Sequence, residues 1–166
     1  MSQKIVTCFF QNLEAELLQV IQSADALVGC VAWLTNSTIL TALAEKPVSI
    51  VVQNESFLSP GNKCTRRDVR TLYKRLQNDF KIDPIRVNGK KKRGIKPLMH
   101  HKFLISLTQC PETFQYKPQA VWTGSFNLTK NSTLSMENAV LIRDPVLAQS
   151  YYTEWEQVYQ KSKTFV

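Results

Sequence analysis

The sequence predicts an α/β protein, an α-β-α sandwich with a mixed, largely parallel central sheet. The first observation is that strand-like apolar runs alternate with helical patterns over the first 52 residues. The second is that two of these runs, 26–34 and 48–52, are apolar almost throughout, as in strands that are buried on both faces. Helices on both faces of a sheet account for both observations.

The expected elements follow from apolar spacing and from the residues that start and end helices. They are, in order, a strand at 5–10, a helix that Asn12 caps, a strand at 26–34, a short helix from Asn36-Ser37 to about Ala44, a strand at 48–52, a helix at 65–80, a strand at 82–87, a strand continuing from Phe103, a strand ending near Gly124, a strand at 139–142 and a helix at 145–162. The segment 108–118 is expected to be an inserted loop or the tip of an extended hairpin. Aromatic residues of the last helix, at helical spacing, are expected in the core rather than as a platform for bases.

Length and composition fit one globular domain, predicted to span residues 1–166. The chain has 43% hydrophobic and 20% charged residues, ordinary values for a globular protein. Its 21 Lys and Arg exceed its 13 Asp and Glu, which gives a net charge of +8. Such a balance favours a polyanionic partner, nucleic acid or an anionic membrane surface, although a merely soluble basic protein would show it too.

Two groups of cations are candidate substrate contacts. The first is one face of the expected third helix, for which a solvated surface is the alternative interpretation. The second is a glycine-flanked basic loop that ends shortly before His100. The predicted substrate-binding residues are Arg66, Arg67, Arg70, Lys74, Lys90, Lys91, Lys92 and Arg93.

Polar side chains suited to phosphate chemistry gather in the second half of the chain. His100 and Lys102 alternate with His101 along an expected strand, so His100 and Lys102 share one face and His101 lies on the other, as a structural histidine. Ser125 and Asn127 repeat this spacing after the next apolar run. An imidazole can attack phosphorus, while an ammonium and an amide can donate to its oxygens.

These residues resemble the signature of the phospholipase D superfamily. His100-x-Lys102 is followed by Gly124-Ser125-x-Asn127 and then by Glu137-Asn138 at the start of a closing strand. The resemblance implies a phospholipase D-like fold and a small single-motif, nuclease-like member. The sequence departs from the family in having Leu107 where an acidic residue usually stands, five positions after the lysine, and in a longer gap before the glycine.

The resemblance also implies a mechanism. His100 would be the nucleophile and acid-base residue, with a phosphohistidine intermediate, and Lys102 and Asn127 would stabilise the phosphoryl oxygens. Ser125 would donate a further hydrogen bond, and Glu137 would orient the imidazole; pairing of Glu137 with a surface lysine is the alternative. Because the chemistry needs a second histidine, a homodimer is expected to share one site.

No metal and no cofactor are expected. The four cysteines lack the spacing of a zinc site, and Cys8 and Cys30 lie in apolar runs that predict buried thiols. No signal peptide or membrane-spanning run is apparent, so a cytoplasmic location without stable membrane association is expected.

The leading functional hypothesis is therefore a metal-independent endonuclease that cleaves DNA or RNA non-specifically. A phospholipid phosphodiesterase acting on cardiolipin or phosphatidylcholine is the second hypothesis. The third is a catalytically decayed nucleic-acid-binding module, which Leu107 would suggest. The sequence leaves open the choice between DNA and RNA, between single and double strands, and the biological pathway.

Overall fold

The computed structural model describes residues 5–58, 67–77, 82–89 and 98–166. Of the expected substrate contacts, Arg66 and Lys90 to Arg93 lie outside the described residues. The helix expected at 65–80 is described from Arg67 to Tyr73 (α3), and nothing is assigned to the side chain of Arg67.

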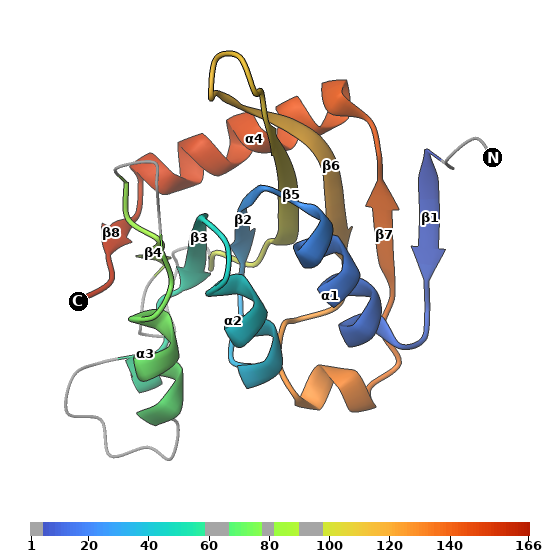
Figure 1. Ribbon diagram of the computed structural model, residues 1–166. Helices are drawn as coiled ribbons and strands as arrows, with labels where there is room; N and C mark the ends of the chain where they lie inside the picture. Colours follow the sequence, from blue (N-terminus) through green and yellow to red (C-terminus); the bar gives the residue numbers. More distant parts are fainter. Residues whose placement is uncertain (1–4, 59–66, 78–81, 90–97) are drawn as a thin grey trace.

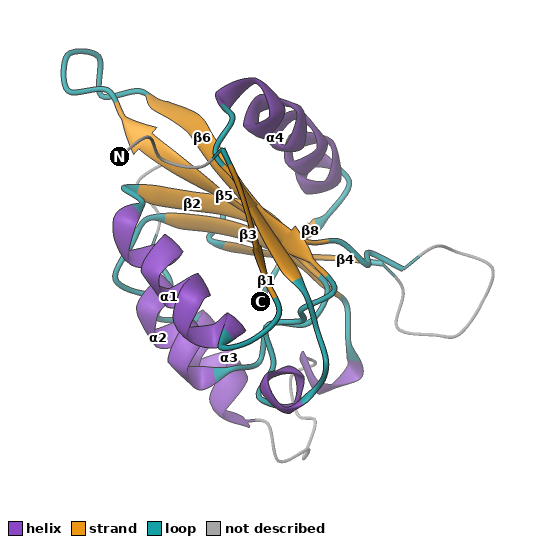
Figure 2. Ribbon diagram, turned by 90° about the vertical axis from the view of Figure 1, so that its right-hand side faces the viewer, coloured by secondary structure: helices purple, strands orange, loops and turns teal. Residues whose placement is uncertain are grey.

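The described chain forms three layers, as the sequence predicts. Helices α1 (Leu13–Ser23), α2 (Ser37–Leu43) and α3 cover one face of an eight-stranded sheet, and α4 (Pro145–Gln160) covers the other (Figures 1 and 2). The strands are β1 (Val6–Phe9), β2 (Ala26–Val31), β3 (Val48–Gln53), β4 (Ile85–Asn88), β5 (Lys102–Gln109), β6 (Tyr116–Gly124), β7 (Ala139–Ile142) and β8 (Lys163–Thr164). Two short 3₁₀ turns, Ser56–Leu58 and Asn131–Leu134, complete the described elements.

The sheet is mixed, as predicted, with the order β1-β7-β6-β5-β2-β3-β4-β8. Only the pairs β2–β3 and β3–β4 are parallel among the described strands, so the parallel share is smaller than the sequence pattern suggests. The reason lies in the second half of the chain. There β5 and β6 form a hairpin and β7 returns beside β6 without a helix crossing the sheet, and such connections produce antiparallel neighbours.

The hairpin accounts for the segment 108–118. β5 continues to Gln109 and β6 begins at Tyr116, so the tip is only the turn between them. Two main-chain hydrogen bonds close this turn, from Cys110 N–H to the Gln115 oxygen and from Phe114 N–H to the Cys110 oxygen, both 2.8 Å long. The segment is therefore an extended hairpin, one of the two interpretations that the sequence allows.

Two apolar clusters hold the layers together. One lies between the sheet and α1–α3 and includes Leu17 and Leu104; the other lies under α4 and includes Phe103 and Trp155. Alternation along β5 sends its side chains to these clusters in turn. Trp155 is buried and Tyr151 packs on Phe103 with ring centroids 5.0 Å apart, which confirms the prediction that the aromatics of the last helix belong to the core.

The two expected helix caps differ in the structure. Asn36 caps α2 with its side chain, accepting hydrogen bonds from Thr38 N–H (2.9 Å) and Ile39 N–H (3.4 Å). Asn12 stands at the cap position of α1, but its side chain makes no capping hydrogen bond and its backbone is left-handed, with φ of 54°. Asparagine tolerates this conformation better than most residues, so Asn12 serves the turn into α1 through its backbone.

The two cysteines expected to be buried also differ. Cys30 is buried in β2 as predicted, but Cys8 is exposed because β1 is an edge strand with one open face. Among the described residues, no helix has both the length and the apolar character needed to span a bilayer.

Candidate active site

The candidate active site lies where four strands end or begin. β5 runs antiparallel to both β2 and β6, and β7 runs antiparallel to β6, so the start of β5 and of β7 meets the end of β2 and of β6. In Figure 1 this is the lower end of the sheet, to which β6 returns and from which β5 rises. His100 precedes β5, Ser125 follows β6 and Glu137 precedes β7, so the topology brings these three residues to one end of the sheet.

Gly124 allows the strands to approach closely at this point. A Cβ atom on Gly124 would overlap the main-chain oxygen of Asn138 and the Cα atom of Ala139, so any other residue would force β6 and β7 apart. The close approach lets Ser125 N–H donate to the Asn138 oxygen at 3.1 Å. The glycine of the Gly-Ser-x-Asn motif is thus required by strand packing.

Ser125 and Glu137 are joined directly. The Ser125 hydroxyl donates to a carboxylate oxygen of Glu137, and Asn138 N–H donates to Ser125 Oγ at 3.1 Å. Among the described contacts, the carboxylate of Glu137 is held by Ser125 rather than by the ring of His100. Within one chain, Glu137 therefore has a fixed position, and its expected role in orienting the imidazole remains a proposal.

Lys102 and His100 share one face of the chain, as strand alternation predicts. Lys102 Nζ lies 3.3 Å from each ring nitrogen of His100 and donates to the His100 main-chain oxygen at 3.0 Å. The imidazole itself is exposed. Partial burial lowers the pKa of Lys102, and the negative charge of Glu137 opposes that shift, which places Glu137 within electrostatic reach of the ammonium.

Asn127 borders a groove beside this pair. The groove has a volume of about 880 Å³ and is lined by residues that include Trp33, Phe57, Asn127, Lys130 and Glu137. The amide oxygen Oδ1 of Asn127 is buried without a hydrogen-bond partner in the described structure. A buried acceptor with no partner is uncommon in proteins.

His101 lies on the opposite face from the site, as predicted. Its Nε2 is 3.1 Å from a carboxylate oxygen of Glu154 on α4, and its ring packs edge-on against Phe103 with centroids 5.5 Å apart. These contacts give His101 a structural role within the chain. The chain therefore brings one imidazole, that of His100, to this end of the sheet.

Arg70 is engaged by the protein itself. Its guanidinium donates to the main-chain oxygens of Leu58 and, at 2.6 Å, Val166, and it lies 4.7 Å from the ring centroid of Phe165. Arg70 thus ties α3 to two neighbouring segments, and this structural role competes with the phosphate contact that the sequence predicts for it. Lys74 directly follows α3, is exposed and stays a predicted substrate contact.

Leu107, the departure from the family pattern, lies far from the site. It is 1% exposed in the cluster under α4 and pairs with Ala26 and Pro118 toward the other end of β5. Leu107 is five positions along the extended strand from Lys102, a distance of about 17 Å. A side chain at this position is too far away to contact the imidazole, so the leucine does not alter the described contacts of His100 and Lys102.

Trp33 and Glu55 are neighbours of the site that the sequence pattern does not reveal. The apolar run 26–34, which contains Trp33, predicts a buried position, but β2 ends at Val31 and Trp33 is 41% exposed. Its ring stands edge-on to the His100 imidazole, with centroids 6.1 Å apart, and its Nε1 donates to Glu55 at 3.0 Å. The available signal is the polar run Thr35-Asn36-Ser37, which indicates that the strand ends near Trp33.

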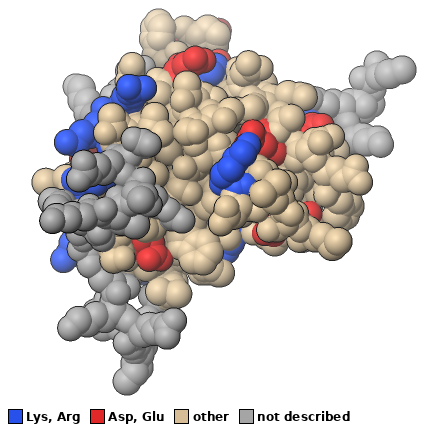
Figure 3. All heavy atoms as spheres, turned by 90° about the horizontal axis from the view of Figure 1, so that it is seen from below, with Lys and Arg blue, Asp and Glu red and all other residues tan. Residues whose placement is uncertain are grey.

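The positive charge of the chain is unevenly distributed. Nine of the 21 Lys and Arg residues, but only one of the 13 Asp and Glu residues, fall in the ranges 1–4, 59–66, 78–81 and 90–97. The rest of the chain is balanced, with 12 of each sign. Seen from below Figure 1, the described surface accordingly shows scattered positive and negative side chains among uncharged ones (Figure 3).

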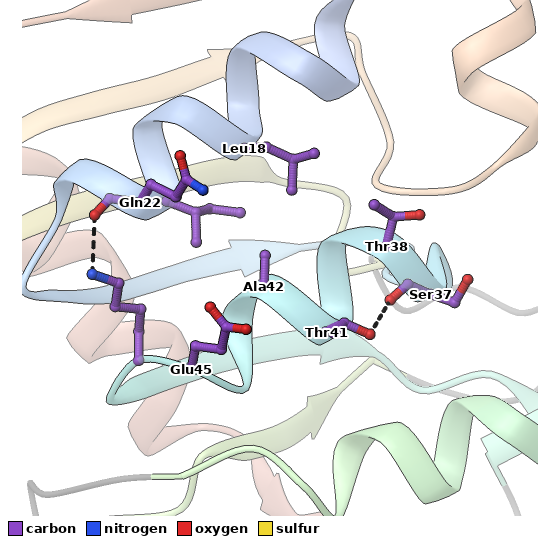
Figure 4. A pocket seen from close by; sticks show the side chains of 9 residues that line it. Leu18, Gln22, Ser37, Thr38, Thr41, Ala42 and Glu45 are labelled. Atoms are coloured by element: carbon purple, nitrogen blue, oxygen red, sulfur yellow. Dashed lines mark hydrogen bonds between the residues drawn. The ribbon is translucent and has the colours of Figure 1, made fainter.

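A second groove lies away from the site, between α1 and α2. Its volume is about 410 Å³, and none of the predicted site residues lines it. Polar groups at its rim bond to the main chain: Lys46 Nζ donates to the Gln22 oxygen at 3.0 Å and Thr41 Oγ1 to the Ser37 oxygen at 2.8 Å (Figure 4). The first of these bonds links the segment after α2 to α1. The groove is therefore explained by the packing of these two helices.

Comparison with known proteins identifies the family. Residues 5–159 match the family described as "Cardiolipin synthase, PLD-like domain". An uncharacterised protein of Acanthamoeba polyphaga mimivirus is 30% identical over 99% of this chain and 68% of its own length.

Similar solved structures have the same fold. Nuc from Salmonella typhimurium, a phospholipase D family member, has a TM-score of 0.64 and 22% identity, covering 95% of both chains. NucT from Helicobacter pylori has a TM-score of 0.70 and 15% identity, covering 96% of this chain and 98% of its own. TrmBL2, an archaeal chromatin protein, has a TM-score of 0.54 and 11% identity, covering 98% of this chain and 54% of its own. With the family match over most of its length and the histidine, lysine, serine and glutamate at one sheet end, the chain belongs to the PLD-like domain family.

Proposed function

We propose that the protein is a metal-independent endonuclease, a single catalytic domain that cleaves DNA or RNA without sequence specificity. The observation that carries this proposal is the exposed imidazole of His100 beside Lys102, at the sheet end that also holds Ser125 and Glu137. The names of the similar proteins Nuc and NucT support nucleic acid as the substrate, as does the DNA binding stated for TrmBL2.

The basic run near the motif supports the same substrate class. Four consecutive cations, Lys90 to Arg93, precede His100 in the sequence, and the last of them is seven residues before it. Cations this close in sequence to a phosphate-reacting histidine suit a polyanionic chain better than a single small phosphodiester, because each can contact a different phosphate.

The proposed reaction has two steps. In the first, a ring nitrogen of His100 attacks phosphorus, the N–P bond forms, and the bond from phosphorus to the leaving nucleoside oxygen breaks. In the second, water attacks phosphorus, the N–P bond breaks, and a phosphomonoester is released with His100 restored. Lys102 and Asn127 would donate to the non-bridging oxygens, and Ser125 would hold Glu137 beside Lys102.

The proton transfers require a second acid-base group, and we propose that it is His100 of a second copy of the chain. That imidazole would protonate the leaving oxygen in the first step and take a proton from water in the second. His101 is committed to Glu154 on the other face and does not supply this group. Lys102 of the second copy would place a further positive charge beside the phosphoryl oxygens, so the chemistry would need no metal ion.

Exposed apolar side chains beside the site support such a dimer. Phe10, Leu134 and Met136 are 73%, 86% and 105% exposed and line one shared hollow. Met136 directly precedes Glu137. Large apolar groups gathered on a surface favour contact with another protein surface, and these three would be covered by a second copy.

The first prediction tests the reaction. Wild-type protein is expected to cleave plasmid and single-stranded DNA in EDTA at low salt, and His100→Ala is expected to lose at least about a thousandfold in rate, because the nucleophile is gone. His101→Ala is the matched control and should retain cleavage. Hydrolysis of cardiolipin vesicles without DNA cleavage would instead favour the alternative function, a phospholipid phosphodiesterase. Tight DNA binding without cleavage would contradict the enzymatic proposal.

The second prediction tests the shared site. Met136→Glu is expected to shift the protein from dimer to monomer in analytical ultracentrifugation and to abolish cleavage, because the charge would be buried against a second copy. Adding an excess of the His100→Ala protein to wild type, with subunit exchange, should lower the rate as mixed dimers form. A wild-type monomer with full activity would rule out the shared site.

A further inference from the structure

We propose that Trp33 is a stacking platform for a nucleobase and that the groove beside it receives an unpaired base of single-stranded nucleic acid. The inference deepens the proposed nuclease function and rests on it for the identity of the substrate. It assigns a binding role to a residue on the β2–α2 connection, outside the histidine, lysine, serine and asparagine motif.

The exposure of Trp33 sets it apart from the other tryptophans. Its side chain is 41% exposed, whereas Trp122 is 2% and Trp155 is 4% exposed. The indole is also fixed in place, because its Nε1 donates to Glu55 at 3.0 Å. A large ring that is both accessible and held by a hydrogen bond loses little conformational freedom when a flat ligand stacks on it.

The position of Trp33 places a bound base next to the reacting phosphate. The indole and the His100 imidazole are 6.1 Å apart between centroids, at an interplanar angle of 83°. A phosphate attacked by His100 would therefore lie beside the tryptophan, and in a nucleotide the base is one sugar away from the phosphate. The geometry suits a nucleotide that spans the two rings.

The groove has the chemistry of a base-binding site. Phe57 and Val69 provide apolar surface, while Asn127, Asn131 and Ser135 provide amide and hydroxyl groups. Asn127 lines the groove, and a side-chain amide can both donate to and accept from the edge of a base. Such a mixture of flat apolar and hydrogen-bonding groups fits a base better than it fits an acyl chain.

The same geometry favours single strands. In a duplex both faces of each base are covered by neighbouring bases and its pairing edge is occupied. A base can lie against Trp33 and present its edge to Asn127 only when it is unstacked and unpaired. Stacking on an aromatic side chain is tolerant of sequence, which agrees with the proposed absence of sequence specificity.

The test measures binding in the His100→Ala protein, so that it does not depend on cleavage. Short oligothymidylate is expected to quench tryptophan emission saturably, because Trp33 is the exposed tryptophan. A strand of abasic residues with the same charge should bind more weakly and without quenching. Trp33→Ala should weaken oligothymidylate binding about 10- to 100-fold in anisotropy, and Trp33→Phe should retain most of the affinity.

Phe114→Ala is the matched control, since Phe114 is 72% exposed on the hairpin between β5 and β6, away from the groove. It should leave affinity and quenching unchanged. Equal affinity for abasic and thymidine strands, no effect of Trp33→Ala, or quenching by phospholipid vesicles alone would overturn the inference. Failure of wild-type protein to cleave, with base-dependent quenching intact, would overturn the nuclease function and leave the stacking site standing.

Discussion

At the scale of single residues, the candidate site is a linked set of charges rather than a row of independent groups. Glu137 accepts from Ser125, and its charge opposes the effect of burial on Lys102. Lys102 in turn lies beside His100. A change at Glu137 is therefore expected to alter the pKa of the Lys102 ammonium without changing His100, the proposed nucleophile.

The third prediction follows from this linkage. Partial burial lowers the pKa of Lys102 and Glu137 raises it, so Glu137→Gln removes the raising contribution and should lower that pKa further. In the proposed mechanism, cleavage requires the charged ammonium and is lost as pH rises through the Lys102 pKa. The alkaline limb of kcat/KM against pH should therefore move to lower pH in the variant.

Ser125→Ala provides the control for this prediction. It removes the hydroxyl that holds Glu137 but keeps the carboxylate charge, so the alkaline limb should stay close to that of wild type even where the rate falls. An alkaline limb that stays in place or moves to higher pH in Glu137→Gln would show that Lys102 does not feel the carboxylate.

Some side-chain positions in the candidate site can be predicted from the sequence alone, and others cannot. Strand alternation is enough to pair His100 with Lys102 and to send His101 to the opposite face, because a period of two needs no tertiary information. The exposure of Trp33 and the main-chain contacts of the Arg70 guanidinium depend on where β2 ends and on which distant segment packs beside α3. Neither follows from local spacing.

At the scale of elements, β5 has one end at the candidate site and the other in the apolar core. Lys102 begins the strand at the candidate site, and Leu107 lies near its far end in the cluster under α4. The family's acidic position is thus occupied here by a residue of the apolar core. This arrangement indicates that the leucine stabilises the packing of α4 on the sheet.

The fourth prediction tests that role. Leu107→Ala should lower the free energy of unfolding by about 2–5 kcal/mol, because it leaves a cavity at a 1% exposed position. Leu107→Asp should be at least as destabilising at neutral pH. A buried carboxyl has a raised pKa, so the cost of Leu107→Asp should shrink as pH falls and the group takes up a proton.

Urea denaturation at several pH values measures these effects, with cleavage assayed on the folded fraction. Neither variant should raise the rate per folded molecule, because the position is about 17 Å along the strand from Lys102. A gain of activity in Leu107→Asp would show that the acid acts on the site after all.

Element prediction from sequence succeeds where the signal is local. Asn36 caps α2 as its side chain and position indicate, and the apolar spacing locates α1 and α4. The directions of β5, β6 and β7 escape this reasoning because parallel and antiparallel strands can show the same apolar runs. The antiparallel pairing of β5 with β6, across the turn closed at Cys110 and Phe114, shows that β6 reverses direction and selects the hairpin from the two interpretations that the sequence allows.

At the scale of the whole molecule, the excess of positive charge is concentrated in a few short ranges of the sequence, 1–4, 59–66, 78–81 and 90–97. Outside them the positive and negative residues are equal in number. Long-range attraction to nucleic acid should therefore depend on those ranges, while contacts at the groove and at His100 determine what happens once the substrate has arrived.

The fifth prediction separates these two contributions. Replacing Lys90 to Arg93 with serine should reduce the slope of log affinity against log salt for single-stranded DNA by up to about 3, since each phosphate contact contributes roughly 0.7. The replacement should weaken binding of thymidine and abasic strands by the same factor, because phosphate contacts do not read bases.

Anisotropy titrations over a range of salt concentrations measure the slope, and the urea midpoint serves as the folding control. An unchanged slope would mean that these four cations do not contact phosphates, and the steering charge would then have to come from the remaining cationic ranges, with Lys63 and Arg66 as the next positions to neutralise.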